Sequence, residues 1–546
     1  MPSVSTFIID RLKNLGIKHV FGVPGDYILP TYKKLTDAKD ITMVNCTDEA
    51  HAGFAADGYA RVSGVGCVFV TYNVGALKIL NSVACAYAER SPVIVLCGSP
   101  GIKERKEGIN LHHMVRSYEC QEEIFRNVTC ATTVLNDPST AGFEIDRVLE
   151  AMAHHRQPVY IEIPRDVAEK AISYDVYSQG TPTATKSDPE NLSEAVAEVA
   201  AWIKGAKDPV IMAGVELARF GFGAELVAFA EKSGIPIVTE ILSKSAVGEQ
   251  HPLFCGVYGG ATSQQTVRNL VEQSDCLLML GVLVTDMSLG FMPPKFKKRD
   301  TVHATVGELK VRNHHYASVV FPEFLKALFK ADCGRTKFVP WTKKSPVRFE
   351  AKENTPLTTS RLFQKIETIL DRSKAIIADV GDSLFGAVDL PVHQSNTFLA
   401  NAFYTSMGTA IPFALGAQLA KPLIRPIVLV GDGAFQMSVS EISTMLDRGL
   451  NPIIIVINNR GYGTERLLLD GKFNDIRNWN YHKVMGLNGL LGAGVGEYAM
   501  DEMSFDQAIN AALRNNEVNV INVEVDPKSM TPALQRMAAG LAKKVV

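Results

Sequence analysis

The sequence predicts an α/β fold of three doubly wound parallel-sheet domains, and three observations lead to this prediction. First, 546 residues exceed what one hydrophobic core normally organises. Second, helical patterns alternate with the apolar segments, so helices are expected to cover both faces of each sheet. Third, these apolar segments are short and end at Gly, Asn, Asp or Pro, as buried parallel strands do: residues 92–98, 158–164, 209–214, 275–281, 375–379, 426–431 and 452–458.

Two polar stretches divide the chain into pieces of ordinary domain size. Residues 177–190 are rich in turn formers, and residues 334–358 are rich in Lys and Pro without a convincing period. They separate pieces of about 180, 150 and 190 residues. The predicted domains are therefore 1–178, 191–340 and 356–546, and no internal sequence repeat connects them.

Composition favours a globular protein in a reducing compartment. Hydrophobic residues make up 46% and the formal net charge is -2, which argues against nucleic acid or an anionic membrane as partner. The nine cysteines occur singly, without a C-x-x-C pair, so reduced and mostly buried thiols are expected. The N-terminus lacks the blocks of a signal peptide, and no apolar run reaches the roughly 18–20 residues that span a bilayer. We expect a cytoplasmic protein.

The sharpest local motif closes two neighbouring predicted strands. Gly431-Asp432-Gly433 ends one and Asn458-Asn459 ends the next, and 459 − 432 = 27 residues leave room for one helix and a returning strand. Adjacent parallel strands would deliver the carboxylate of Asp432 and the amide oxygen of Asn459 to the same edge of the sheet, where open α/β sheets bind ligands. Magnesium prefers such oxygen ligands, and the carbonyl of Gly461 could supply a third. Taken alone, each motif is as readily explained as a turn.

The motifs together resemble those of thiamine-diphosphate-dependent enzymes, whose signature is G-D-G followed by N-N. Residues 20–26 (V-F-G-V-P-G-D), residues 48–61 (D-E-A-H-A-G-F-A-A-D-G-Y-A-R) and residues 91–100 are similar to that family's pyrimidine-binding domain. Within the family, the chain is most similar to the pyruvate, indolepyruvate and phenylpyruvate decarboxylases. The resemblance implies thiamine diphosphate and Mg²⁺ as cofactors, with pyrimidine-binding, middle and diphosphate-binding domains in that order.

The resemblance also assigns residues to the coenzyme. Met407 would wedge between its two rings, although Met is also ordinary packing material, and the carbonyl of Thr405 would hold the pyrimidine amino group. The diphosphate and its ion would lie against residues that follow the strands of the third domain: Gly381, Asp382, Ser383, Asp432, Gly433, Ala434, Asn459, Gly461 and Tyr462.

Glu49 matches the family's glutamate that hydrogen-bonds the pyrimidine ring and drives it to the imino form. Its small and apolar neighbours in sequence, such as Ala50 and Gly53, lead us to expect a raised pKa for this carboxyl group. The alternative is a glutamate that only stabilises the start of a helix.

Four further residues match the acid–base set of the pyruvate-type decarboxylases. These are Asp26, the adjacent pair His112 and His113, and Glu465. Such a set would protonate the enamine left when CO2 departs and then assist release of the aldehyde. Each residue has a structural alternative: Asp26 could cap a helix, the histidines could be a surface pair, and Glu465 could be a solvated helix residue.

Departures from the pyruvate-specific pattern suggest a larger substrate. Thr464, Tyr404 and the pair Asp286-Met287 stand where bulkier residues are usual, and residues 111–117 resemble the phenylpyruvate branch better. We therefore expect non-oxidative decarboxylation of an aromatic or branched 2-oxo acid. A pyruvate-preferring decarboxylase, a thiamine-dependent carboligase and a non-catalytic relative are the alternatives. In the family the first and third domains meet across a subunit interface, which implies a homodimer or homotetramer.

Overall fold

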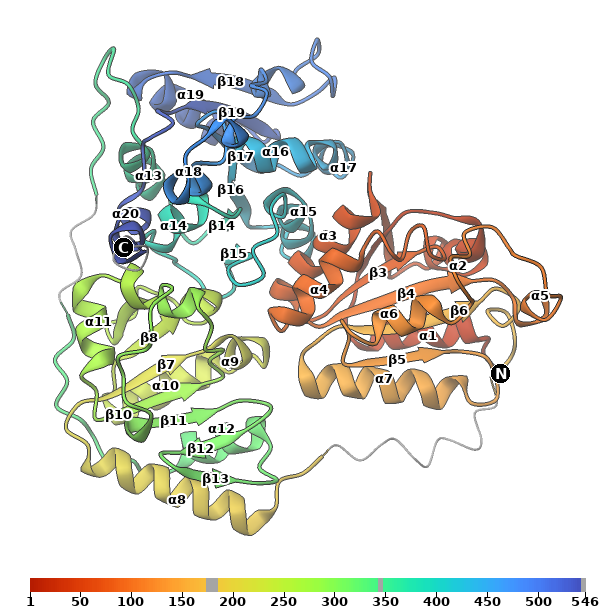
Figure 1. The fold of residues 1–546 in the computed structure, drawn as a ribbon, viewed down its shortest axis with the longest axis horizontal. Coiled ribbons are helices and arrows are strands. Elements are labelled where there is room, and N and C mark those ends of the chain that lie inside the picture. The colour runs from red at the N-terminus through yellow and green to blue at the C-terminus, as the bar shows by residue number, and fades with distance from the viewer. Residues whose placement is uncertain (173–184, 342–346, 542–546) are drawn as a thin grey trace. The chain divides into compact units, whose positions relative to one another are not determined.

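The computed structural model describes residues 1–172, 185–341 and 347–541, and these residues form three sheets with helices around them (Figure 1). The predicted boundary at 178 and most of the predicted linker 177–190 lie outside the described residues. The chain divides into two compact units. One holds Met1–Ala184, Ile411–Leu423 and Ser438–Leu450, and the other holds Thr185–Ala410, Ile424–Met437 and Asn451–Val546.

The first sheet is parallel throughout, with the order β2-β1-β3-β4-β6-β5. Its strands are β1 (His19–Gly22), β2 (Thr42–Asn45), β3 (Gly66–Val70), β4 (Val93–Ser99), β5 (Ala131–Val134) and β6 (Val159–Pro164). Its helices are α1 (Val4–Asn14), η1 (Asp26–Ile28), α2 (Leu29–Asp37), α3 (Glu49–Ser63), α4 (Leu80–Ala88), α5 (Ile102–Arg105), α6 (Cys120–Phe125) and α7 (Ala141–His155). The order reverses at β1, so the expected doubly wound sheet is confirmed.

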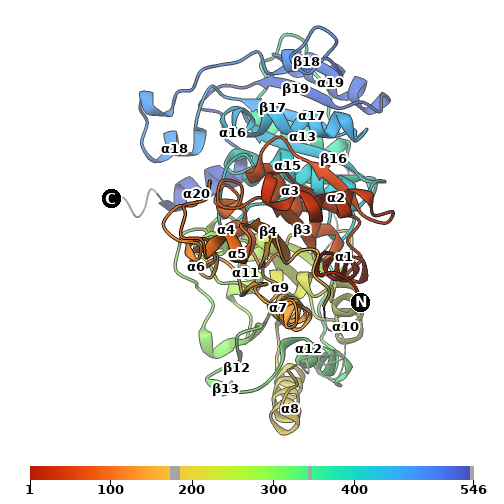
Figure 2. The same cartoon turned by 90° about the vertical axis from the view of Figure 1, so that its right-hand side faces the viewer.

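The middle sheet has the order β13-β12-β11-β10-β7-β8-β9 and is parallel except at one edge. Its strands are β7 (Pro209–Ala213), β8 (Ile237–Glu240), β9 (Phe254–Tyr258), β10 (Cys276–Leu280), β11 (Thr301–Ala304), β12 (Leu309–Val311) and β13 (His314–Tyr316). Its helices are α8 (Pro189–Gly205), α9 (Val215–Arg219), α10 (Gly223–Ser233), η2 (Ile241–Ser243), η3 (Gly260–Thr262), α11 (Gln265–Glu272), η4 (Met287–Leu289), η5 (Lys298–Asp300) and α12 (Phe321–Lys330). The antiparallel pairs of β12 with β11 and β13 were not predicted, because strands of three residues show too little pattern. Helix α8 packs along β12 and β13 (Figure 1 and Figure 2).

The third sheet is again parallel, with the order β15-β14-β16-β17-β19-β18. Its strands are β14 (Lys374–Ala378), β15 (Phe398–Ala400), β16 (Arg425–Gly431), β17 (Ile453–Asn458), β18 (Val495–Ala499) and β19 (Asn519–Glu524). The helices in this part of the chain are α13 (Thr359–Thr368), α14 (Asp382–Val388), α15 (Ala410–Ala420), α16 (Asp432–Ser438), η6 (Val439–Glu441), α17 (Ile442–Asp447), α18 (Gly463–Leu468), η7 (Lys472–Asn474), η8 (Tyr481–Val484), α19 (Glu502–Arg514) and α20 (Pro532–Leu541). Of these, α15 from Ile411 onward, η6 and α17 belong to the unit of the first sheet. Register places Gly431 beside Ile457, so β16 and β17 end at the same edge, as predicted.

The predicted strands are buried on both faces, which explains their continuous apolar sequences. All residues of β3, β4, β6, β7, β10 and β17 are buried. The nine cysteines are free, and seven of them are buried, in agreement with the reduced thiols that were expected.

Candidate active site

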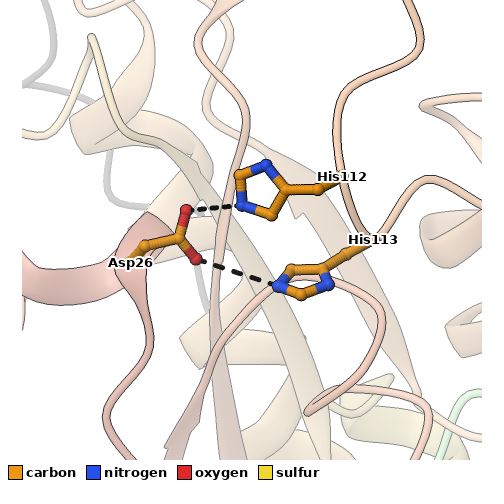
Figure 3. Close-up of side chains that lie close together, drawn as sticks. All are labelled: Asp26, His112 and His113. Carbon is orange, nitrogen blue, oxygen red and sulfur yellow. Dashed lines mark hydrogen bonds and ion pairs between the residues drawn. The ribbon is translucent and has the colours of Figure 1, made fainter.

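Three of the predicted acid–base residues lie together in the first unit. Asp26 begins η1, which follows β1 after residues 23–25, and His112 and His113 lie in the loop that follows α5. His112 Nε2 is 2.8 Å from Asp26 Oδ2, and His113 Nε2 is 3.9 Å from Asp26 Oδ1 (Figure 3). We call these three residues the acid–base cluster. Their side chains are partly exposed, so a small molecule and water can reach them.

Two residues that the sequence did not single out hold the cluster in place. The Tyr27 hydroxyl is 3.3 Å from His112 Nδ1, and the Asn73 side-chain amide donates to the carbonyl of His113 at 2.7 Å. Burial, and then the charge of Asp26, raise the pKa of Tyr27, so its hydroxyl keeps its proton. The position of Tyr27 next to Asp26 was the one signal that could have identified it.

Glu49 is the first residue of α3, where Asp48 caps the helix by accepting from the amide of Ala50 at 2.8 Å. The expected surroundings of small and apolar groups are only part of what the structure contains. Lys78 Nζ lies 3.0 Å from the carboxylate of Glu49 and 2.5 Å from that of Asp48. This cation was not predicted from the sequence, because Lys78 is remote from Glu49 along the chain and reaches it only in the fold.

In the other unit, Asp432 stands at the end of β16 as predicted. Its residue is 1% exposed, and its two carboxylate oxygens accept from the amides of Gly433 at 2.8 Å and Gly461 at 3.0 Å. Burial raises its pKa to about 6, although these amides oppose the shift. Within the described residues Asp432 has no ion pair, so this buried charge has no side-chain cation beside it.

The other predicted ligands gather around the same strand ends. The side-chain nitrogen of Asn459 lies close to Gly463, because a Cβ added to Gly463 would stand 2.6 Å from that nitrogen. A Cβ on Gly433 would come within 2.8 Å of the Tyr462 ring, so glycine permits the approach of that ring. Gly461, predicted to offer its carbonyl to an ion, directs its amide at Asp432. Ala434 follows in the first turn of α16 and is buried. A buried carboxylate that accepts only from backbone amides among the described residues fits a divalent ion such as Mg²⁺.

The segment predicted to contact the diphosphate begins α14. Gly381 has φ +90°, which glycine adopts without strain, and Ser383 is buried. The carboxylate of Asp382 accepts from the amide and the hydroxyl of Thr531, and burial raises its pKa to about 6. This carboxylate is therefore already hydrogen-bonded, and a diphosphate contact here would fall to the backbone amides.

The loop that carries Thr405 and Met407 is held by two buried side chains that the sequence did not reveal. Asn401 accepts from the amide of Thr405 at 2.8 Å and donates to the carbonyl of Ser406 at 3.1 Å. Asp379 accepts from the amides of Gly408 at 3.1 Å and Ala410 at 2.9 Å. Thr405 has φ +57°, a conformation that a β-branched residue adopts only when its surroundings enforce it.

Glu465 lies in the second unit, on α18, with an exposed side chain. Asp26, His112 and His113 belong to the first unit, so the grouping of Glu465 with them stays a prediction. Thr464 lies near Gly381, with its hydroxyl 3.3 Å from where a Cβ would stand. None of the helices in the described ranges is both long and apolar enough to cross a membrane.

Comparison with known proteins gives consistent results along the chain. Models of the thiamine pyrophosphate enzymes match three segments: the N-terminal TPP-binding domain at residues 2–124, the central domain at 196–328 and the C-terminal TPP-binding domain at 379–523. An indole-3-pyruvate decarboxylase of Azospirillum brasilense is 32% identical over 494 residues, 89% of each chain. A pyruvate decarboxylase of Candida glabrata is 30% identical over 95% of each chain. An alpha-keto-acid decarboxylase of Mycobacterium avium is 31% identical over 97% of this chain and 95% of its own.

Proposed function

The chain belongs to the thiamine-pyrophosphate-dependent 2-oxo acid decarboxylases, and on this premise we propose that it converts an aromatic or branched 2-oxo acid to an aldehyde and CO2 with the help of Mg²⁺. When bound, thiamine diphosphate supplies a carbanion that adds to the oxo group and accepts the electrons left by CO2. The observation that carries the proposal is the acid–base cluster, which gathers three proton-carrying side chains at 2.8 and 3.9 Å.

Asp432, Asn459 and Gly461 would hold the magnesium ion. The support is electrostatic, because Asp432 is a buried carboxylate that only backbone amides contact. A divalent ion would replace the missing cation and connect this edge of the third sheet to an anionic diphosphate. Gly433, Ala434 and Tyr462 would line the same edge. Gly381 and Ser383 would add backbone amides, and Thr405 and Met407 would contact the coenzyme rings.

Glu49 would share a proton with the pyrimidine ring of the coenzyme. Its carboxylate sits at the positive end of α3, where the helix and Lys78 both favour the negative charge. The ring nitrogen would have to compete with Lys78, which can keep Asp48 as its partner after Glu49 is released.

The acid–base cluster would move protons at the reacting carbon. His112 and His113 flank the carboxylate of Asp26, so a proton taken from water can pass among three neighbouring groups. One proton replaces CO2, and the aldehyde is then released. Glu465 would join the cluster from a second subunit, and we propose a homodimer or homotetramer in which the first unit of one protomer faces the third sheet of its partner.

The preferred substrate class rests on Thr464, Tyr404 and Met287, which leave less bulk than the pyruvate-specific pattern. The name of the Azospirillum relative supports an indolyl substrate, and the name of the Candida relative supports pyruvate as the alternative. The test is an aldehyde-release assay with pyruvate, branched, phenyl and indolyl 2-oxo acids, with and without thiamine diphosphate and Mg²⁺. We expect activity only with both cofactors and a higher kcat/KM for phenylpyruvate or indolepyruvate. Equal or better turnover of pyruvate would refute the substrate class, and turnover without cofactors would refute the mechanism.

A further inference from the structure

We propose that Tyr27 is a positioning residue that fixes both the ring orientation and the proton of His112. The inference rests on the proposed function, because it gives His112 a specific form within the acid–base cluster. It concerns contacts within the first unit alone.

The ring of Tyr27 is fixed on several sides. Its residue is 2% exposed, and its ring stacks on His112 with centroids 4.8 Å apart and planes at 21°. The rings of His113 and Tyr72 meet it edge-on at 6.2 Å and 5.9 Å. The Arg165 guanidinium lies 5.1 Å from its centroid and is itself paired with Glu104. An aromatic ring held in this way gives the imidazole a rigid surface to lie on.

The hydrogen bonds of His112 then determine where its proton lies. His112 Nε2 is 2.8 Å from Asp26 Oδ2, and a carboxylate only accepts, so Nε2 must carry a proton. In a neutral imidazole the other nitrogen is an acceptor. The Tyr27 hydroxyl, 3.3 Å from Nδ1, is the donor that this nitrogen requires. The His112 carbonyl, 3.4 Å from the same hydroxyl, is the second acceptor within its reach.

These hydrogen bonds determine which nitrogen of His112 carries the exchangeable proton. A donor at Nδ1 favours the unprotonated state of that nitrogen and opposes the doubly protonated imidazolium. The charged or titratable groups that face His112 are Asp26, His113 and Tyr27, and Arg165 and Glu104 lie behind the Tyr27 ring. Tyr27 therefore keeps the exchangeable proton on Nε2, between His112 and Asp26.

The test compares Tyr27→Phe, which keeps the stacked ring and removes the hydroxyl, with Tyr316→Phe as control. Tyr316 is a buried tyrosine of the middle domain whose hydroxyl donates to Glu198 at 2.6 Å. In Tyr27→Phe we expect kcat/KM to fall roughly two- to tenfold, the effect of one net hydrogen bond. The acid limb of its pH profile should move to higher pH, because protonation of Nδ1 is no longer opposed. Tyr316→Phe should leave both kcat/KM and the acid limb of the pH profile unchanged.

The direct measurement is the nitrogen chemical shift of His112 in [¹⁵N]histidine-labelled protein, assigned by the loss of its signals in His112→Gln. Wild type should show a protonated Nε2 and a bare Nδ1 near neutral pH, and Tyr27→Phe should show a larger share of rings protonated on both nitrogens at the same pH. A wild-type His112 with its proton on Nδ1, or an unchanged tautomer and pH profile in Tyr27→Phe, would overturn the inference. A wild-type His112 with its proton on Nδ1 would overturn the inference even if the variant does not fold. Absence of CO2 release by wild type would instead contradict the proposed function and leave the tautomer measurement valid.

Discussion

The first and third sheets have the same strand order but differ in what surrounds several of their buried carboxylates. Numbered within each sheet, both orders read 2-1-3-4-6-5, so β1 corresponds to β14, β3 to β16 and β4 to β17. In both sheets the strand order reverses at the first strand, and open sheets bind ligands at the carboxyl ends of the strands beside such a point. Asp26 follows β1, whereas Asp379 and Asp432 follow β14 and β16.

In the first sheet and its helices, side-chain cations neutralise the carboxylates. Arg61 pairs with Asp57 and Glu89, each at 2.8 Å, and Arg105 pairs with Glu162 at 2.7 Å. In the third sheet, Asp379 and Asp432 accept only backbone amides among the hydrogen bonds of the described residues, and burial raises the pKa of each to about 6. One topology can therefore either balance a buried carboxylate with a side-chain cation, as at Arg61, or leave it to backbone amides, as at Asp432.

The largest effect on activity is expected at Glu49, the residue of the first domain that would share a proton with the pyrimidine ring of the coenzyme. Glu49→Gln should lower kcat by about 10²–10⁴-fold, the usual contribution of a positioned proton-transfer group. The measurement is CO2 release at saturating thiamine diphosphate and Mg²⁺, with Glu353→Gln, an exposed position, as control. Retention of more than a tenth of the wild-type rate would contradict the role given to this carboxyl group.

The internal charge balance of the first unit can be broken at Arg61. Arg61→Met leaves Asp57 and Glu89 buried without their cation, so the free energy of unfolding should fall by about 3–5 kcal/mol. Urea denaturation measures it. The control is Arg116→Met, since Arg116 pairs with Glu123 on the surface and its loss should change stability by less than about 1 kcal/mol. Equal losses of unfolding free energy in the two variants would show that burial does not determine how much these ion pairs contribute to stability.

The buried carboxylate of Asp379 in the third sheet should make the free energy of unfolding depend on pH. Its pKa is raised from 3.8 to about 6, so the folded state binds more protons than the unfolded state within that window, and stability falls as pH rises through it. The whole shift corresponds to about 3 kcal/mol, of which about 1 kcal/mol is lost between pH 5 and 7. Asp379→Asn should remove this part of the slope in unfolding measured at both pH values. A steeper fall of stability with pH in the variant would contradict a raised pKa of Asp379.

The smallest effect is expected at Lys78, which competes for Glu49. Lys78→Ser should strengthen the binding of thiamine diphosphate to the cofactor-free protein roughly two- to fivefold, because a half-exposed ion pair contributes less than about 1 kcal/mol. Titration calorimetry measures it, and salt should narrow the difference from wild type. Lys39→Ser, at the opposite end of β2, removes the same charge elsewhere. Weaker binding in Lys78→Ser would mean that Lys78 assists the coenzyme instead of competing with it.

Much of the fold followed from sequence, because continuous apolar segments bounded by Gly, Asn or Asp identify buried parallel strands. The antiparallel edge of the middle sheet did not, since β12 and β13 have three residues each. The shared strand order of the first and third sheets could not be predicted from the sequence either. Strand order depends on which edges pair, and the two domains show no repeat in sequence.

The candidate site also has a part that the sequence predicted and a part that it did not. The sequence, through its resemblance to the thiamine-dependent family, predicted the residues Asp26, Glu49, His112, His113 and Asp432. Their partners became visible in the tertiary structure: Tyr27 and Asn73 at the histidines, Lys78 at Glu49, and backbone amides at Asp432. A motif specifies atoms near one another along the chain, whereas hydrogen bonds and ion pairs join atoms that meet only when the sheets are assembled.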